Sequence, residues 1–505
     1  MNSYIGTDEK FRAFTDEATF ARISADETVS KMWQRCACAY ADKTALVHAG
    51  SSVTFAELDE RVSAFRGALS AKGVKPLTRL ALLSRNSIDF AVMFLGAVTL
   101  GCAVIVLPPH LGEKEVAGVC KMFGASALIA EAALKEKCVL APALNPGIIL
   151  LTSDETGEKD VPAFESGAED ECVIMFTGGT TGKSKGAVLT HAAVMQGTVN
   201  GCYGVRDVFE QKYILILPLS HVFGLIRNLL YCIFTGSALF ISASPQNLFK
   251  DIAAFRPTAL VMVPALAEMA LQLSKKLGRN MLGDSVKYII CGAAAVPQFL
   301  VEEYDKIGIT LFPGYGLTES ANLVSGNPVP LKKPGSVGIS YPNQQLKIVD
   351  GELWLRGKNM LKGYVGTDEV AWTEDGWFRT GDLVTMDEDG FLYITGRIKE
   401  IIVLDNAENI SPAALEERFN ALPFVQDSQV FEAVGDNGKH ILALEVVLRA
   451  SEIASLGENP KAKAEEALWQ INNAQRPAER VSKITIRDTD FARSPSMKII
   501  RYKQV

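Results

Sequence analysis

The stretch CVIMFTGGTTGKSKG, residues 172–186, joins an apolar block to a turn of glycines, threonines and lysines. CVIMF is short and apolar on both faces, which predicts a buried strand. Glycines let backbone N–H groups approach a phosphate, threonine hydroxyls add donors and Lys185 adds charge, so the turn is predicted to bind phosphate. A Walker loop needs glycine where Thr177 stands, which disfavours a P-loop kinase or ATPase. A plain glycine-rich turn is the other alternative.

Similar apolar blocks recur along the chain and alternate with segments of helical periodicity. The segment 54–73 predicts an amphipathic helix with a capping box at Thr54 and Glu57, and Gly73 can end it. The apolar blocks suit strands of parallel sheets covered by helices, and they begin at residues 80, 127, 172, 213, 259 and 287. The fold class predicted is α/β, with a large N-terminal domain of helix-covered, mostly parallel sheets. From about Phe391 the pattern changes to a smaller α+β unit, which predicts domains 1–396 and 397–505.

Composition limits the classes of function. The chain has 505 residues, 48% of them hydrophobic and 22% charged, which indicates a globular protein of two or more domains. A formal net charge of −7 argues against a nucleic-acid-binding protein. The nine cysteines lack metal-ligand spacing, and Cys36 and Cys38 form only a C-x-C pair, so a zinc site is a weak alternative to reduced thiols. The charged N-terminus does not resemble a signal peptide, and a cytoplasmic location is expected.

One stretch has the length of a membrane span. Residues 90–107 run without a charge, but Gly101 divides them and their second half is a β-branched block followed by two prolines. A buried helix leading into a buried strand is predicted instead, and no transmembrane segment is expected.

Six motifs in order resemble the adenylate-forming superfamily, which includes acyl-CoA synthetases, luciferase and peptide-synthetase adenylation domains. They are FTGGTTGKSKGAVLTH (176–191), LPLSHVFG (217–224), GYGLTES (314–320), GWFRTGDL (376–383), GRIKEII (396–402) and SPSMKIIR (494–501). The resemblance covers nearly the whole chain. It implies that a carboxylic acid and ATP form an acyl-adenylate and pyrophosphate, after which a thiol displaces AMP.

The resemblance also implies roles for individual residues in binding ATP. The phosphate loop consists of Thr177, Gly178, Gly179, Thr180, Thr181 and Lys185. The adenine site consists of Tyr315 and the backbone of Gly292, Ala293, Ala294, Gly314 and Gly316. Thr318 contacts the α-phosphate and Glu319 binds Mg²⁺, a hard cation that prefers oxygen ligands. Asp382 accepts the ribose hydroxyls, and Arg397 reaches the ribose or the phosphates.

The small C-terminal domain is implied to be a mobile lid. Lys498 matches the lysine that bridges the attacking carboxylate and the α-phosphate, and Lys399 matches the hinge. Some positions depart from the family pattern: Gly178 replaces serine, Ser184 replaces a common proline, and Met497 replaces glycine. Asn406 and Ala407 stand where a glycine usually lets the thiol pass, which puts the second half-reaction in most doubt.

The acid is predicted to be fatty or another non-amino acid. Amino-acid-activating members carry an aspartate in the region of LPLSHVFG, whereas His221 is followed here by Val222 and Phe223. His221 is expected at the acyl tunnel, and the other pocket residues are Val263, Pro264, Ala293 and Gly314. The resemblance is strongest to fatty-acyl-CoA synthetases with CoA as acceptor. An aryl acid, an acyl-carrier protein as acceptor and a non-catalytic ATP-binding homologue remain alternatives, and the oligomeric state stays open.

Overall fold

The computed structural model describes residues 4–23, 26–177, 185–368, 370, 372–403, 409–434, 440–453, 456–493 and 499–501. The chain forms two compact units. The large unit comprises Tyr4–Gln345 and Leu355–Gly376, and the small unit comprises Leu346–Trp354 and the chain from Trp377 onward.

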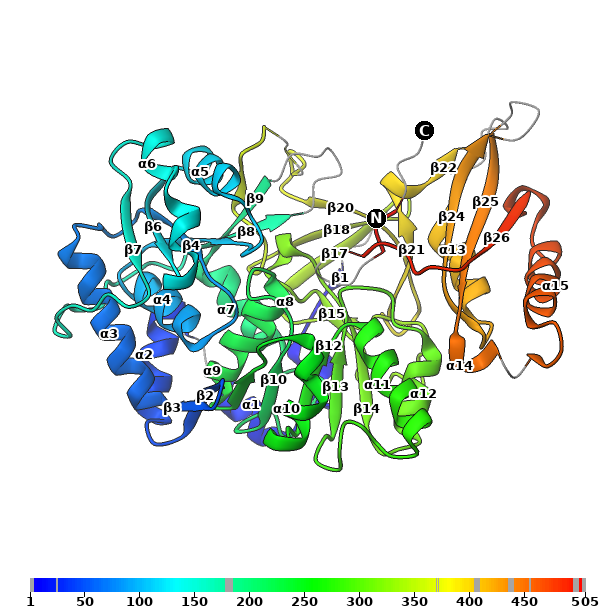
Figure 1. Ribbon diagram of the computed structural model, residues 1–505, viewed down its shortest axis with the longest axis horizontal. Helices are drawn as coiled ribbons and strands as arrows, with labels where there is room; N and C mark the ends of the chain where they lie inside the picture. The colour runs from blue at the N-terminus through cyan, green and yellow to red at the C-terminus, as the bar shows by residue number, and fades with distance from the viewer. Residues whose placement is uncertain are drawn as a thin grey trace. The chain divides into compact units, whose positions relative to one another are not determined.

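A seven-stranded sheet forms one part of the large unit, with the strand order β19-β9-β8-β5-β4-β6-β7 (Figure 1). Its core is parallel, and β9 and β19 add an antiparallel edge beside β8. The bounds are β4 Arg79–Leu83, β5 Ala103–Leu107, β6 Ala125–Ala130, β7 Ile149–Thr152, β8 Glu171–Thr177, β9 Lys185–Thr190 and β19 Gly363–Val365.

A nine-stranded sheet forms the other part, with the order β16-β15-β14-β13-β12-β10-β11-β2-β3. Its six central strands are parallel, and β3, β15 and β16 join them antiparallel. The bounds are β2 Thr44–His48, β3 Ser51–Thr54, β10 Lys212–Leu215, β11 Ala238–Ile241, β12 Ala259–Met262, β13 Tyr288–Cys291, β14 Thr310–Tyr315, β15 Ser325–Gly326 and β16 Ile339–Ser340.

Helices cover these sheets, as the apolar strand blocks predict. Helix α4 packs against β4 and β5 of the first sheet and β2 of the second, so it lies between them. The large unit contains α1 Glu17–Arg22, α2 Val29–Ala39, α3 Phe55–Ala71, α4 Ile88–Thr99, α5 Glu113–Met122, α6 Ala141–Leu144, α7 His191–Asn200, α8 Val222–Gly224, α9 Tyr231–Thr235, α10 Leu248–Phe255, α11 Pro264–Leu277 and α12 Gln298–Asp305. The predicted α/β class is confirmed.

Two local predictions are confirmed in residue detail. The Thr54 hydroxyl accepts from the Glu57 N–H and the Glu57 carboxylate accepts from the Thr54 N–H, which forms the capping box of α3. The uncharged stretch 90–107 forms most of α4 and then β5, and every residue of the stretch is buried. Gly101 adopts φ +86° between them, a conformation that glycine reaches without strain. Among the described residues, no helix is long and apolar enough to cross a membrane.

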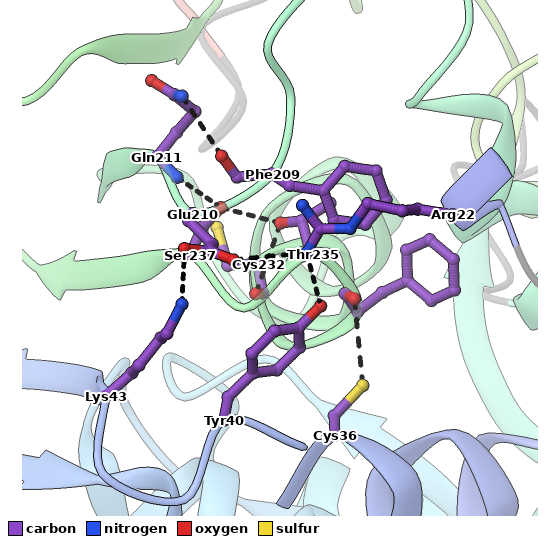
Figure 2. Close-up of polar contacts among 11 residues, drawn as sticks. Arg22, Cys36, Tyr40, Lys43, Phe209, Glu210, Gln211, Cys232, Thr235 and Ser237 are labelled. Atoms are coloured by element: carbon purple, nitrogen blue, oxygen red, sulfur yellow. Dashed lines mark hydrogen bonds and ion pairs between the residues drawn. The ribbon is translucent and has the colours of Figure 1, made fainter. Parts of the chain in front are cut away.

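The N-terminal segment, residues 4–23, is bound to the rest of the large unit by a polar cluster around Glu210 (Figure 2). Arg22, the last residue of α1, donates to Glu210 at 3.3 Å and to the Tyr40 hydroxyl at 3.2 Å, and Lys43 also pairs with Glu210. The Glu210 N–H donates to the carbonyl of Thr235 at 2.9 Å, which links the cluster to the end of α9.

The small unit contains antiparallel strands followed by a three-stranded sheet with two packed helices. Within Leu346–Trp354 it contains parts of β17 (Gln344–Val349) and β18 (Glu352–Gly357). Its other elements are β20 Phe378–Met386, β21 Leu392–Arg397, β22 Ile402–Val403, β23 Asn409–Ile410, α13 Pro412–Asn420, β24 Val425–Val434, β25 His440–Leu448, α14 Ala450–Ile453, α15 Pro460–Asn473 and β26 Lys483–Arg487. Helices α13 and α15 share one apolar core with the sheet β24-β25-β26.

Candidate active site

The predicted phosphate loop connects β8 to β9 at the edge of the seven-stranded sheet. Thr177 ends β8, Lys185 begins β9, and the two residues are paired across the hairpin. Gly178, Gly179, Thr180 and Thr181 lie outside the described residues. The Thr177 hydroxyl is buried and has no hydrogen-bond partner in the part of the chain that the structure describes. A buried hydroxyl without a partner is costly, so this donor fits a ligand oxygen such as a phosphate.

Tyr364 connects the hairpin to the predicted magnesium carboxylate. Strand β19 pairs with β9 and places Tyr364 opposite Ala187. The Lys185 ammonium lies 3.8 Å from the centroid of the Tyr364 ring, and the Tyr364 hydroxyl donates to Glu319 Oε1 at 2.8 Å. Lys185, Tyr364 and Glu319 therefore form one cluster of a cation, a phenol and a carboxylate.

The backbone around Glu319 is tightly folded. A Cβ at Gly316 would lie 1.3 Å from the carbonyl oxygen of Asn322, so only glycine fits at this position. Ala321 and Asn322 adopt φ values of 47° and 92°, a region that non-glycine residues rarely occupy. Thr318 and Glu319 lie in the short 3₁₀ helix η5 (Thr318–Ser320) within this turn. The Asn322 side-chain amide nitrogen is buried without a partner among the described residues. Backbone strain of this kind clusters at functional sites.

The predicted adenine and acid pockets share a wall at the carboxyl ends of β12, β13 and β14. Because parallel strands bring their carboxyl ends to one edge of a sheet, segments distant in sequence meet here. The Gly292 N–H donates to the carbonyl of Met262 at 3.3 Å. A Cβ at Gly292 would lie 3.0 Å from the carbonyl of Gly314 and 3.7 Å from the Phe223 ring. Gly292, Gly314 and Phe223 are therefore neighbours.

Other predicted pocket residues lie in the same segments. Val263 and Pro264 begin α11 directly after β12 and are buried. Ala293 adopts φ 68° two residues after β13, and Ala294 is exposed. Tyr315 ends β14, where it pairs with Ser325.

His221 begins the helix that follows β10. Its Nδ1 accepts the N–H of Phe223 at 3.2 Å, as an N-cap side chain does. Because Nδ1 is the acceptor, the neutral ring carries its proton on Nε2. His221 can therefore present an N–H donor to a carboxylate.

The small unit contains two further predicted residues and the predicted hinge. Asp382 on β20 is 2% exposed, and Arg397 on β21 is opposite it and donates to its Oδ1 at 2.5 Å. Lys399 is exposed in the 3₁₀ helix η6 (Ile398–Glu400), directly after β21. Lys498, Met497, Asn406 and Ala407 lie outside the described residues.

Sequence reasoning missed Tyr364. The tripeptide Gly363–Val365 has no local signal of function, because its place in the site depends on the pairing of β19 with β9. Among the described residues, no group of three or more histidine, cysteine, aspartate or glutamate side chains could hold a metal ion by itself. Glu319 with its Tyr364 partner fits a Mg²⁺ ion that also uses phosphate oxygens and water, which is the usual arrangement for this metal.

A hairpin predicted to bind phosphate lies beside a carboxylate in an α/β fold with a separate small unit, which is an arrangement typical of a nucleotide-binding enzyme. The chain belongs to the AMP-binding enzyme family, whose model matches residues 33–365. It is an AMP-forming acid–CoA ligase, which uses ATP to form an acyl-adenylate and then transfers the acyl group to CoA.

Similar proteins include CoA ligases of different acids. The chain is 30% identical over 465 residues to a long-chain-fatty-acid–CoA ligase of Escherichia coli O157:H7, covering 79% of this chain and 82% of the relative. It is 28% identical over 403 residues to a feruloyl-CoA synthase of Amycolatopsis sp., covering 76% and 81%. The crystal structure of the anthranilate CoA ligase AuaEII with anthranoyl-AMP has a TM-score of 0.82 at 20% identity, covering 94% of this chain and 95% of that one. ATP-bound MatB from Rhodopseudomonas palustris has a TM-score of 0.80 at 23% identity, covering 93% and 97%.

Proposed function

We propose that the acid is a non-amino carboxylic acid, fatty or aryl, and that Mg²⁺ bound at Glu319 assists its adenylation. The observation that supports this most is the cluster of Lys185, Tyr364 and Glu319 beside Thr177. It combines a cation for phosphate, a carboxylate for metal and a hydroxyl donor that lacks a partner among the described residues.

The proposed roles at this cluster follow from charge. Lys185 and the Thr177 hydroxyl, with Gly178, Gly179, Thr180 and Thr181, hold the β- and γ-phosphates. Tyr364 holds the Glu319 carboxylate in one orientation. Thr318 donates to the α-phosphate. Mg²⁺, when bound, neutralises phosphate charge as pyrophosphate leaves.

The acid is proposed to enter between His221 and the wall formed by Gly292 and Gly314. The Nε2–H of His221 can donate to its carboxylate. Val263, Pro264 and Ala293 complete the pocket. Relatives that are named for a long-chain fatty acid and for ferulate support both an aliphatic and an aryl acid, and no aspartate follows His221 to bind an amine.

The remaining roles concern adenosine and the lid. Tyr315 packs on adenine next to the backbone of Gly316 and Ala294. Asp382 and Arg397 contact the ribose, and the buried Asp382 carboxylate is already held in place by its ion pair. Lys498 neutralises charge at the α-phosphate, and residues 397–505 rotate about Lys399 between the two half-reactions.

A panel of carboxylic acids, each with ATP and Mg²⁺ and with or without CoA, tests the proposal. Pyrophosphate and thioester are measured by mass spectrometry. We expect pyrophosphate only with an acid, and thioester only with CoA. A holo acyl-carrier protein in place of CoA tests the other acceptor. Release of phosphate instead of pyrophosphate would indicate a kinase or ATPase, and ATP binding without any acid-dependent pyrophosphate would indicate a non-catalytic homologue.

A further inference from the structure

Arg227 is a buried cation in the helix that begins at His221. Helix α8, the π-helical turn η3 (Leu225–Leu230) and α9 form one continuous helical run, and Arg227 lies in its π-helical part. The side chain is only 1% exposed. π-Helical turns inside α-helices are rare and frequently occur at functional sites.

The charge of Arg227 is not compensated within the described part of the chain. Its Nε and Nη1 atoms have no hydrogen-bond partner there, and no carboxylate pairs with it. The groups that interact with its charge include phenols, those of Tyr231, Tyr213, Tyr288 and Tyr341, and its guanidinium lies 4.0 Å from the centroid of the Tyr231 ring. Burial raises the pKa of Tyr213, Tyr231 and Tyr288 well above the ordinary value, so these phenols are neutral. Arginine remains protonated in proteins, so Arg227 is a cation among neutral groups.

A second buried arginine, Arg66, differs from Arg227 because each nitrogen of its guanidinium donates a hydrogen bond within the protein. Arg66 is 8% exposed. Its three nitrogens donate to the carbonyl of Val161 at 2.9 Å, the Thr99 hydroxyl at 3.2 Å and the Ser63 hydroxyl at 3.2 Å. A buried charge without such partners is strongly destabilising, so the partner that Arg227 lacks is expected to come from a ligand.

Asn228, the residue next to Arg227, is also buried without hydrogen bonds from its side chain to the described residues. Asn228 is fully buried, and neither its side-chain oxygen nor its side-chain nitrogen has a partner among the described residues. Gly201, which follows α7, packs closely against both side chains, since a Cβ there would lie 3.3 Å from Arg227 Nε and 2.7 Å from the Tyr231 ring. Two adjacent residues therefore offer unused hydrogen-bonding groups in the interior.

The position of Arg227 relates it to the acid pocket. Phe223 precedes Arg227 by four residues, a spacing that places two side chains on one helix face, about 6 Å apart along the axis. Phe223 lies near Gly292 at the carboxyl end of β13, since a Cβ at Gly292 would be 3.7 Å from its ring. Arg227 is therefore about one turn further along the helix than Phe223, and the Tyr213 and Tyr288 phenols of β10 and β13 interact electrostatically with its charge.

We infer that Arg227 binds a second anionic group at the far end of the acid, so that the preferred substrate is a dicarboxylic acid of which one carboxylate is activated. This inference rests on the proposed acid pocket. The guanidinium offers paired N–H donors to a carboxylate, the geometry that arginine recognises best. Site groups that need a hydrogen-bonding partner reject a ligand that lacks one, because they are left unpaired.

The test compares acids that differ only in the second carboxylate. Each linear dicarboxylate from succinate to sebacate is paired with the monocarboxylate of equal carbon number, and terephthalate is paired with benzoate. Acid-dependent pyrophosphate exchange gives kcat and KM for wild type, Arg227→Met, Arg227→Lys and the control Arg66→Met. For at least one pair we expect wild type to prefer the dicarboxylate by about a hundredfold or more in kcat/KM. Arg227→Met should abolish this preference mainly through KM and keep monocarboxylate activity, Arg227→Lys should retain part of it, and Arg66→Met should leave the ratio unchanged.

Thermal unfolding of wild type without ATP gives a second measurement that does not depend on catalysis or on the variants folding. A preferred dicarboxylate should raise the unfolding temperature more than its matched monocarboxylate does. A wild type that favours the monocarboxylate in every pair overturns the inference while leaving the proposed function intact. Equal loss of both activities in folded Arg227→Met means that the arginine is structural, which also overturns it. Absence of exchange with every acid refutes the proposed function, and the unfolding shift then decides the inference by itself.

Discussion

Tyr364 contacts both Lys185, in the hairpin of β8 and β9, and Glu319. Its ring contacts the Lys185 ammonium and its hydroxyl donates to the Glu319 carboxylate, so one side chain positions two opposite charges. Lys185 and Glu319 therefore lie in one cluster although their residue numbers differ by 134.

Glu319→Ala tests the carboxylate directly. We expect pyrophosphate exchange to fall by at least roughly tenfold, because a strong electrostatic contact made in the transition state is removed. Tyr364→Phe is the matched variant, because it keeps the ring beside Lys185 and loses only the hydroxyl that holds Glu319. It should raise the Mg²⁺ concentration needed for half-maximal exchange, with a smaller loss of rate than Glu319→Ala. Full activity of Glu319→Ala across magnesium concentrations would refute the metal assignment.

His191 contributes to the pH dependence of stability. It is 1% exposed, its Nδ1 accepts the Val29 N–H at 3.2 Å, and burial lowers its pKa from 6.5 to about 4. The unfolded chain therefore binds more protons between pH 4 and 6.5, so stability is present above this window and is lost as the pH falls through it. The loss between pH 7 and pH 5 is about 2 kcal/mol.

His191→Gln keeps an acceptor for Val29 without the titration. Urea unfolding at pH 7 and pH 5 should show a smaller difference between the two pH values for this variant than for wild type. An unchanged difference would mean that other groups cause the pH dependence.

At the scale of elements, the turn that contains Glu319 depends on a close approach between backbones. In Gly316→Ala the new Cβ would meet the Asn322 carbonyl at 1.3 Å, so the turn must move and displace Thr318 and Glu319. We expect loss of adenylation in a protein that keeps its far-UV circular dichroism. Gly363→Ala is the control, because a Cβ there has no neighbour within 4 Å among the described atoms. Normal exchange in Gly316→Ala would show that this turn does not position Glu319.

The N-terminal segment is attached both by apolar packing and by ion pairs, and we expect the packing to contribute more to the free energy of unfolding. Phe11 is fully buried and stacks on Tyr341 with ring centroids 5.3 Å apart, whereas the Glu210 side chain is 45% exposed although it pairs with Arg22 and Lys43. Phe11→Ala should cost about 3–5 kcal/mol of unfolding free energy, because it leaves a cavity. Glu210→Gln should cost about 0–1 kcal/mol, as exposed ion pairs do. Denaturant unfolding measures both, and equal costs would contradict this division.

At the scale of the whole molecule, the two half-reactions make different demands on one site. In the proposed mechanism, adenylation needs the Lys498 ammonium at the α-phosphate, whereas thioester formation needs access for a thiol. A rotation of residues 397–505 about Lys399 would satisfy both, since hinges consist of a few residues that absorb a change in φ and ψ.

Lys399→Pro tests this rotation. Proline fixes φ near roughly −65°, so the variant should be locked in one state. We expect acid-dependent pyrophosphate exchange to persist while thioester production collapses, as measured on the same preparation. Lys399→Ala, which changes the same exposed side chain without restricting the backbone, should retain both activities. If both activities fall together in folded Lys399→Pro, or neither falls, the hinge at this residue is wrong.

The fold class and much of the local structure followed from sequence alone. The capping box of α3, the helix and strand within residues 90–107 and the strand blocks depend on periodicity and on side chains a few positions apart, which act within one element. The order of six motifs was sufficient to indicate the family. The positions of Val263, Gly292 and Gly314 at one edge were also predictable, because parallel strands align their carboxyl ends.

Only the tertiary structure brought Tyr364 between Lys185 and Glu319, and only it showed that Arg227 is buried with Nε and Nη1 lacking a partner among the described residues. Neither local sequence indicates a special role. A tyrosine in a short strand such as GYV (363–365) has no fixed role, and an arginine in a helix such as LIRNLL (225–230) is usually exposed. Their importance arises from strand pairing and helix packing between distant segments. Such contacts are set by the burial of the whole chain, which no local pattern encodes.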